Sequence, residues 1–187
     1  MPITATEFPG LFILEPVILK DDRGYFFEAY NEQGLQQQGI GIRFVQDNQS
    51  FSKHGVIRGL HYQLEPYAQT KLIRVLQGRI LDVVLDIRKG SPTYGKSMSI
   101  ELSADNKKQF LIPQGFAHGF SVLSETAEVM YKCDAFYNKA SEGGILYNDP
   151  ALNIDWGLTS AEIVVSSKDL ELPVFAECRN TFEYGNK

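Results

Sequence analysis

Short runs rich in aromatic and β-branched residues recur along the whole chain, separated by Gly, Pro, Asn and Asp. Long stretches with helical periodicity are almost absent. This pattern is typical of an all-β domain built from many short strands. The regular spacing favours a double-sheet jelly roll or barrel. It predicts central strands over residues 44–50, 56–63, 71–76, 80–88, 97–102, 109–112, 118–123 and 127–135.

Weaker signals mark the two ends of the chain. Residues 11–19 and 25–30 flank turn-forming residues and predict a hairpin. Residues 31–38 suit one or two helical turns, and the Thr159-Ser-Ala-Glu162 sequence resembles a capping box that would start a second short helix. Beyond residue 150 the pattern loosens into a C-terminal appendage. At 187 residues the chain suits one domain, for which we expect the bounds 1–187.

The overall composition excludes several classes of protein. With 43% hydrophobic and 22% charged residues the chain is typical of a folded soluble protein. No apolar run approaches the roughly 20 residues of a membrane span. A net charge of −5 argues against nucleic acid as a partner. No secretory signal is visible, and Cys133 and Cys178 form no disulfide framework or metal spacing, so we expect a cytoplasmic protein.

Alternation along the predicted strands sorts the polar residues by face, because side chains two apart share a face. In residues 80–88 the odd-numbered side chains are apolar and the even-numbered ones include Asp82 and Asp86, which predicts a sheet with one face on a core. Several ionisable residues instead stand in mostly apolar rows. The residues are His61, Lys71, His118 and Tyr131. If those rows are the inner faces of the sheets, the four side chains project into one partly dry cavity.

Arg58 breaks this parity, because it lies three residues before His61. We expect either a bulge near Gly59 or a position for Arg58 at the mouth of the cavity, since glycine permits such re-aiming. The chain has three histidines, and a metal site would require His54 to reach inward. Gln63 stands where a His-x-His pair would have its second histidine, so we expect neither a metal nor a cofactor. Any one of these residues alone is more often structural, and their co-occurrence indicates a proton-transfer site.

Motifs spread over nearly the whole chain resemble one family, the dTDP-4-dehydrorhamnose 3,5-epimerases, which are metal-independent members of the cupin superfamily. The resemblance implies a cupin-like double-stranded β-helix, or jelly roll, with short peripheral helices. The motifs are Asp22-Arg-Gly-Tyr-Phe-Phe-Glu28, Gln46-Asp-Asn-Gln-Ser50, Gly55-Val-Ile-Arg-Gly-Leu-His-Tyr-Gln63, Ala68-Gln-Thr-Lys71, Ser91-Pro-Thr-Tyr-Gly95, Ile112-Pro-Gln-Gly-Phe-Ala-His-Gly-Phe120, Tyr131-Lys-Cys133 and Ser167-Lys-Asp169.

The resemblance implies an isomerase that inverts C3 and C5 of dTDP-4-dehydro-6-deoxy-D-glucose, in the formation of dTDP-L-rhamnose. By resemblance His61 is the base, Tyr131 the acid, Asp169 the partner of the imidazole and Lys71 the stabiliser of the enolate. The family pattern also implies a homodimer, with N-terminal strands that reach the partner and residues 150–187 packed on the barrel. The implied substrate-binding residues are Arg23, Glu28, Gln46, Asn48, Arg58, His118, Glu142 and Lys168.

Other functions share these motifs or this fold. Relatives that invert only C3 or only C5 of a related nucleotide-linked sugar remain an alternative. A non-catalytic cupin that binds a nucleotide sugar is an alternative of a different class. Such a protein would not need an acid and a base on opposing walls.

Overall fold

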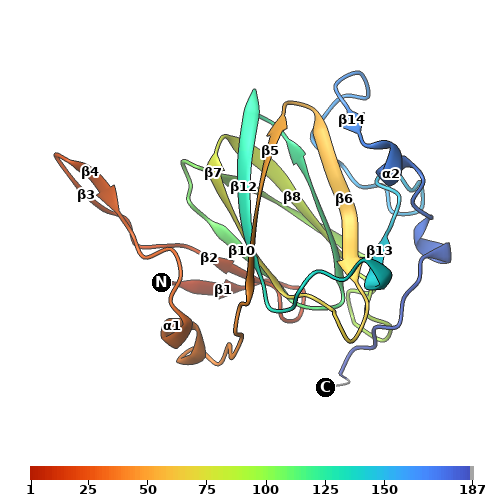
Figure 1. Ribbon diagram of the computed structural model, residues 1–187, viewed down its shortest axis with the longest axis horizontal. Helices are drawn as coiled ribbons and strands as arrows, with labels where there is room; N and C mark the ends of the chain where they lie inside the picture. Colours follow the sequence, from red (N-terminus) through yellow and green to blue (C-terminus); the bar gives the residue numbers. More distant parts are fainter. Residues whose placement is uncertain (186–187) are drawn as a thin grey trace.

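Two β-sheets pack face to face, and a two-stranded arm projects from one end of them (Figure 1). The computed structural model describes residues 1–185. The first sheet has the order β1-β2-β10-β7-β12-β5. Its strands are β1 (Ile3–Ala5), β2 (Phe12–Leu14), β10 (Gln109–Ile112), β7 (Lys71–Gln77), β12 (Thr126–Cys133) and β5 (Gln46–Lys53).

The second sheet has the order β13-β6-β11-β8-β9, and β14 pairs with β6 in parallel. Several pairs of strands that follow each other along the chain, such as β5 and β6 or β11 and β12, lie in opposite sheets, as in a jelly roll. The predicted jelly roll is therefore confirmed. The strands of the second sheet are β13 (Glu142–Gly144), β6 (Val56–Gln63), β11 (Phe116–Val122), β8 (Arg79–Asp86), β9 (Ser97–Ser103) and β14 (Val164–Val165).

Apolar side chains from both sheets fill the space between them. Ile73 and Val129 of the first sheet meet Val84 and Phe120 of the second in one buried cluster. The outer face of β8 is covered as well, because Val83 packs in a separate cluster with side chains of the C-terminal segment. The side chains of β8 therefore alternate between two faces, as predicted. Both faces are buried, so the expectation of one buried face is wrong.

Strand β6 carries a bulge opposite β11. The pairing advances by three residues on β6, from Arg58 to His61, against two on β11, from Phe120 to His118. Gly59 has φ +117°, and a Cβ there would lie 2.6 Å from the carbonyl oxygen of His118. Only glycine fits this close approach without strain. The bulge predicted near Gly59 is confirmed.

The N-terminal strand predicted over residues 11–19 is interrupted. β2 ends at Leu14 and joins the first sheet, while β3 (Leu19–Asp21) and β4 (Gly24–Phe26) form the separate arm. Pro16 has no N–H to donate to a sheet, which explains the break. The predicted helix is present as α1 (Glu32–Gln36), where the side chain of Asn31 accepts a hydrogen bond from the N–H of Gly34.

The C-terminal segment differs from its prediction at Thr159. Glu162 accepts hydrogen bonds from the N–H and hydroxyl of Thr159, at 2.8 and 2.6 Å, but the residues form a turn and no helix. The N–H of Val164 then donates to the carbonyl of Gly55, and the chain takes an extended conformation there as it pairs with β6. The helical elements that flank this segment are η1 (Lys139–Ser141), α2 (Ser167–Leu170) and η2 (Phe175–Glu177).

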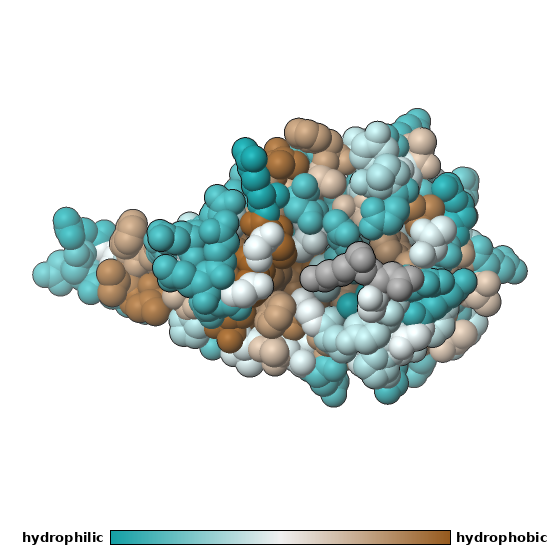
Figure 2. Space-filling view, turned by 90° about the horizontal axis from the view of Figure 1, so that it is seen from below, coloured by the Kyte–Doolittle hydropathy of each residue, from teal (hydrophilic) through white to brown (hydrophobic). Residues whose placement is uncertain are grey.

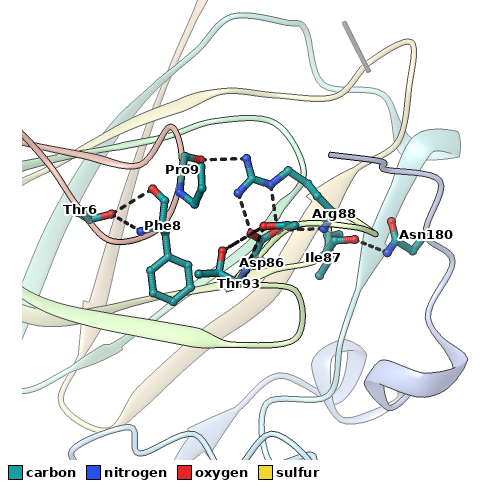
Figure 3. A network of polar contacts seen from close by, with 9 residues as sticks. Thr6, Phe8, Pro9, Asp86, Ile87, Arg88, Thr93 and Asn180 are labelled. Atoms are coloured by element: carbon teal, nitrogen blue, oxygen red, sulfur yellow. Dashed lines mark hydrogen bonds and ion pairs between the residues drawn. The ribbon is translucent and has the colours of Figure 1, made fainter. Parts of the chain in front are cut away.

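A polar cluster joins distant parts of the chain (Figure 3). The Arg88 guanidinium bonds both oxygens of Asp86, at 2.9 and 2.7 Å, and donates to the carbonyl of Pro9 at 2.9 Å. Thr93 donates to Asp86 from the following loop, and Asn180 donates to the carbonyl of Ile87. Asp86 is fully buried, so its charge depends on these partners.

Candidate active site

One histidine and one carboxylate from distant parts of the chain form a close pair. His61 of β6 places Nε2 2.7 Å from Oδ1 of Asp169, in the short helix α2. The Ser166 side chain caps this helix by accepting the Asp169 N–H at 3.1 Å. The N–H of Gly59 donates to the second Asp169 oxygen at 3.4 Å. The bulge of β6 therefore fixes both the histidine and its partner.

The carboxylate of this pair is buried, whereas the imidazole reaches the cavity. The Asp169 side chain is 6% exposed and the His61 side chain 33%. Burial opposes ionisation of Asp169, but the hydrogen bond with His61 and the neighbouring positive charge hold its pKa below the ordinary value. An ionised Asp169 accepts the Nε2 proton of His61, which leaves Nδ1 as the ring nitrogen that can take a proton from a ligand.

A second histidine lies beside the first. His118 of β11 pairs directly with His61 across the two strands. Its Nε2 lies 3.0 Å from each oxygen of Asp82, which is on β8 and fully buried. Two imidazoles on neighbouring strands are thus each held by a carboxylate.

Lys71 and Tyr131 stand on neighbouring strands of the facing sheet. The Lys71 Nζ lies 6.0 Å from the centre of the Tyr131 ring. Burial lowers the pKa of Lys71, and the carboxylates of Asp82 and Glu142 oppose that shift. Burial also raises the pKa of Tyr131, so its phenol keeps its proton at neutral pH.

These side chains line one cavity of about 510 Å³ between the two sheets. Arg58 and Lys168 stand on its wall, which confirms that Arg58 faces the cavity through the bulge. A neighbouring cavity of about 370 Å³ shares His61, Lys71 and Tyr131 with the first. It is also lined by Gln46, Asn48, Tyr137 and Glu142.

The arrangement of these side chains suits proton transfer to and from an organic ligand. His61 and His118 stand on one sheet, and Tyr131 and Lys71 stand on the other. A base and an acid on opposite walls suit removal of a proton from one face of a ligand and delivery to the other. A buried ammonium suits the negative charge that forms between these steps.

Comparison with known proteins identifies the relatives of this chain. The model of the dTDP-4-dehydrorhamnose 3,5-epimerase family matches residues 5–177. The enzyme of that name from Shigella flexneri is 48% identical over 178 residues, which cover 95% of this chain and 97% of the relative. The chain belongs to the dTDP-4-dehydrorhamnose 3,5-epimerase family.

Two solved structures carry informative ligands. The dTDP-6-deoxy-D-glucose-3,5-epimerase of Legionella pneumophila Philadelphia 1 was solved with dTDP-4-keto-L-rhamnose; it is 46% identical, with a TM-score of 0.89 and coverage of 94% of this chain and 93% of that one. A 3′-monoepimerase from Streptomyces bikiniensis, solved with dTDP-quinovose, is 31% identical, with a TM-score of 0.85 and coverage of 91% and 86%. The family, jelly-roll fold and epimerase class predicted from the motifs are confirmed.

Two residues that the family pattern assigns to substrate binding lie away from the cavities. Arg23 sits on the arm, where its side chain is 90% exposed and pairs with Asp21 at 2.6 Å. Glu28 follows the arm and accepts a hydrogen bond from Asn31 at 3.0 Å. Within one chain the fold brings together the other predicted site residues but not these two.

Sequence reasoning missed two residues of the site. Tyr137 lines the second cavity, where its hydroxyl donates to Glu142 at 3.2 Å and its N–H to Gln46 at 3.0 Å. It lies between β12 and β13, outside any alternating pattern that could have placed it. Asp82 did carry a signal, because it is a carboxylate within a strand whose neighbours are apolar.

The remaining histidine does not reach the site. His54 places Nε2 2.9 Å from Glu162 at the surface end of β6. Within the described residues, no group of three or more His, Cys, Asp or Glu side chains is arranged to hold a metal ion. Over residues 1–185, no helix is both long and apolar enough to cross a membrane.

Proposed function

We propose that this chain inverts C3 and C5 of dTDP-4-dehydro-6-deoxy-D-glucose to give dTDP-4-dehydro-L-rhamnose, on the route to dTDP-L-rhamnose. The observation that carries the proposal is the cavity in which the His61–Asp169 pair faces Tyr131 and Lys71. The C4 ketone of such a sugar acidifies the hydrogens at both neighbouring carbons. The reaction therefore needs proton transfer and no change of oxidation state.

His61 is the proposed base. Its Nδ1 removes the proton from C3 or C5, and the resulting imidazolium is stabilised by ionised Asp169 2.7 Å from Nε2. Asp169 keeps its proton-accepting role because its pKa is held low. The pair thus fixes the tautomer of the ring before the substrate arrives.

Tyr131 is the proposed acid on the opposite wall. Its raised pKa keeps the phenol protonated, so it can deliver a proton to the face of the sugar ring opposite His61. Lys71 stabilises the enolate oxygen at C4 while the carbon is planar. Inversion follows because removal and return of the proton occur from different sides.

The dTDP moiety extends from the sugar site to the cations at the rim. Arg58 on the cavity wall presents a planar guanidinium that suits phosphate oxygens. Lys168, which is paired with Glu142 at 2.8 Å, supplies a further cation. The amides of Gln46 and Asn48 and the carboxylate of Glu142 are proposed contacts of the nucleotide or sugar in the adjoining cavity.

The proposed assembly is a cytoplasmic homodimer in which each arm completes the site of the partner subunit. Large apolar side chains on the arm are exposed, and they gather on the projection seen at the left of Figure 2. Arg23 and Glu28 lie on or beside that arm and do not line either of the two cavities that contain His61. The exposed apolar residues are Val17, Leu19, Tyr25 and Phe26.

A coupled assay tests the proposed reaction. The chain is incubated with dTDP-4-dehydro-6-deoxy-D-glucose and a reductase specific for the 4-keto group of dTDP-4-dehydro-L-rhamnose. We expect dTDP-L-rhamnose as the product. A sugar inverted at one centre would instead indicate a single-centre epimerase, as in the Streptomyces relative, and binding of dTDP without any product would indicate a non-catalytic cupin.

A further inference from the structure

The Asp82–His118 pair has no part in the proton transfers described above. Asp82 is fully buried, and both of its oxygens lie 3.0 Å from Nε2 of His118. His118 is 8% exposed and lines the main cavity beside His61. A buried carboxylate is costly unless it is paired, so its presence on the inner wall calls for a reason.

Asp82 also acts on the cation of the site. Its partner His118 lines the same cavity as Lys71. There the Asp82 carboxylate and the Lys71 ammonium each favour the charged form of the other. Burial raises the pKa of Asp82, and the positive charges of His118 and Lys71 oppose that shift. The ionisable groups around Lys71 come from five strands and from helix α2; they are His61, His118, Asp82, Tyr131, Cys133, Glu142 and Arg58 on the strands, and Lys168 and Asp169 on the helix.

Asp82 is the group among these best suited to keep Lys71 protonated. Burial raises the pKa of the Cys133 thiol to about 11, so it carries no charge at neutral pH. Glu142 is paired with Lys168 at 2.8 Å, and Asp169 is paired with His61 at 2.7 Å. His61 and His118 add no negative charge. The fully buried Asp82 therefore supplies the negative charge that is least screened by water.

We propose that Asp82 is a positioning residue that keeps Lys71 cationic and holds the His118 ring in one orientation at the sugar site. With Nε2 engaged by Asp82, His118 meets a ligand through Nδ1, next to the base His61. This inference rests on the proposed role of Lys71 in stabilising the enolate. It adds a second carboxylate to the machinery, one that touches no substrate.

The test is the pH profile of Asp82→Asn. Asparagine keeps the shape of the side chain and an oxygen that can accept the Nε2 proton of His118, but it removes the charge. Without that charge the ammonium of Lys71 is less stable, so activity is lost at lower pH. We expect the pH at which kcat/KM declines on the alkaline side to be lower by about one unit or more than in wild type. Above that pH, kcat should fall about tenfold for each further pH unit.

Asp86→Asn is the matched control. Asp86 is a fully buried carboxylate on the same strand, but it bonds Arg88, Ser91 and Thr93 and lies outside both cavities (Figure 3). We expect this variant to lower the melting temperature and to leave the alkaline limb in place. A purely structural role of Asp82 would give the same behaviour in Asp82→Asn.

The outcomes separate the inference from the proposed function. If a folded Asp82→Asn variant keeps the alkaline limb of wild type, the role of Asp82 is overturned. Turnover by wild type in the same assay still upholds the epimerase. Failure of the wild type in the same assay overturns the epimerase itself. If Asp82→Asn does not fold, Asp82→Ser removes the same charge with a smaller side chain, and the same shift of the limb is expected.

Discussion

His61 and His118 are paired across neighbouring strands, but their carboxylate partners come from different elements. Asp169 is held by the capped helix α2, about a hundred residues along the chain from His61, and Asp82 comes from the next strand of the same sheet. The residue types therefore do not by themselves define roles. The role of each imidazole depends on which ring nitrogen its carboxylate engages and on which side chains stand on the opposite wall of the cavity.

Lys71→Ala tests the electrostatic contribution of the buried ammonium. Removing one charge-stabilising donor typically costs about 10²–10³ in rate, and we expect that loss in kcat, with a smaller change in KM. Steady-state kinetics at saturating substrate measure it. Near-normal turnover in this variant would reject the assignment of Lys71.

Asp169 gives a prediction about stability and pH. Its folded pKa lies below the ordinary value, so the ionised form favours the folded state above the unfolded pKa of about 3.9. We expect wild type to be more stable than Asp169→Asn at neutral pH, in urea unfolding. The difference should shrink as the pH falls below about 4 and through the lower folded pKa. A difference that is independent of pH would contradict the pairing.

At the scale of elements, the bulge of β6 decides which side chains face the cavity. It brings Arg58 and His61 to the same cavity although they lie three residues apart. It also turns the N–H of Gly59 toward Asp169. The strand irregularity is thus part of the site.

Gly59→Ala tests the bulge. The added Cβ would meet the carbonyl oxygen of His118 at 2.6 Å, and alanine would be strained at φ +117°. We expect a loss of at least about 2 kcal/mol in the free energy of unfolding, together with a loss of turnover. Gly41→Ala is the control, since nothing lies within 4 Å of its added Cβ. Equal stability of the two variants would contradict the role of Gly59.

Alternation and turn residues were sufficient to predict the central strands. β6 and β10 have the predicted bounds, because each is a β-prone run between clear breaks. Pairing with β6 overrode the capping-box signal at Thr159, because contacts between elements can outweigh a local preference. The bulge could be predicted because Arg58 and His61 are three residues apart, which would place them on opposite faces of a regular strand. The partner of His61 came from the family motif, since no local pattern places Asp169 beside it.

For the whole molecule, we propose that the exposed arm completes the site of a partner subunit. Phe26 on the arm is 70% exposed, and the Arg23 side chain is 90% exposed and pairs with Asp21 of the same arm. The C-terminal segment, by contrast, packs on the second sheet and supplies Asp169. We expect residues 1–187 to unfold in one cooperative transition, as a single domain.

Mixing two inactive variants tests the exchange of the arm. Arg23→Ala dimers would lack the arginine in both sites, and His61→Ala dimers would lack the base. In a mixed dimer that forms after subunit exchange, the Arg23→Ala chain keeps its own His61 and receives Arg23 from the partner subunit. We expect activity to return on mixing. If Arg23 served its own chain, or no dimer formed, mixing would restore none.

The measurement that tests the central claim most directly is the exchange of substrate protons with solvent. Wild type, Tyr131→Phe and His61→Ala are each incubated with dTDP-4-dehydro-6-deoxy-D-glucose in D₂O, and C3 and C5 are followed by NMR. We predict deuterium at both carbons with inversion in wild type, exchange without inversion in Tyr131→Phe, and no exchange in His61→Ala, which should still bind dTDP. Binding of the substrate by wild type without deuterium at either carbon would contradict a proton-transfer site.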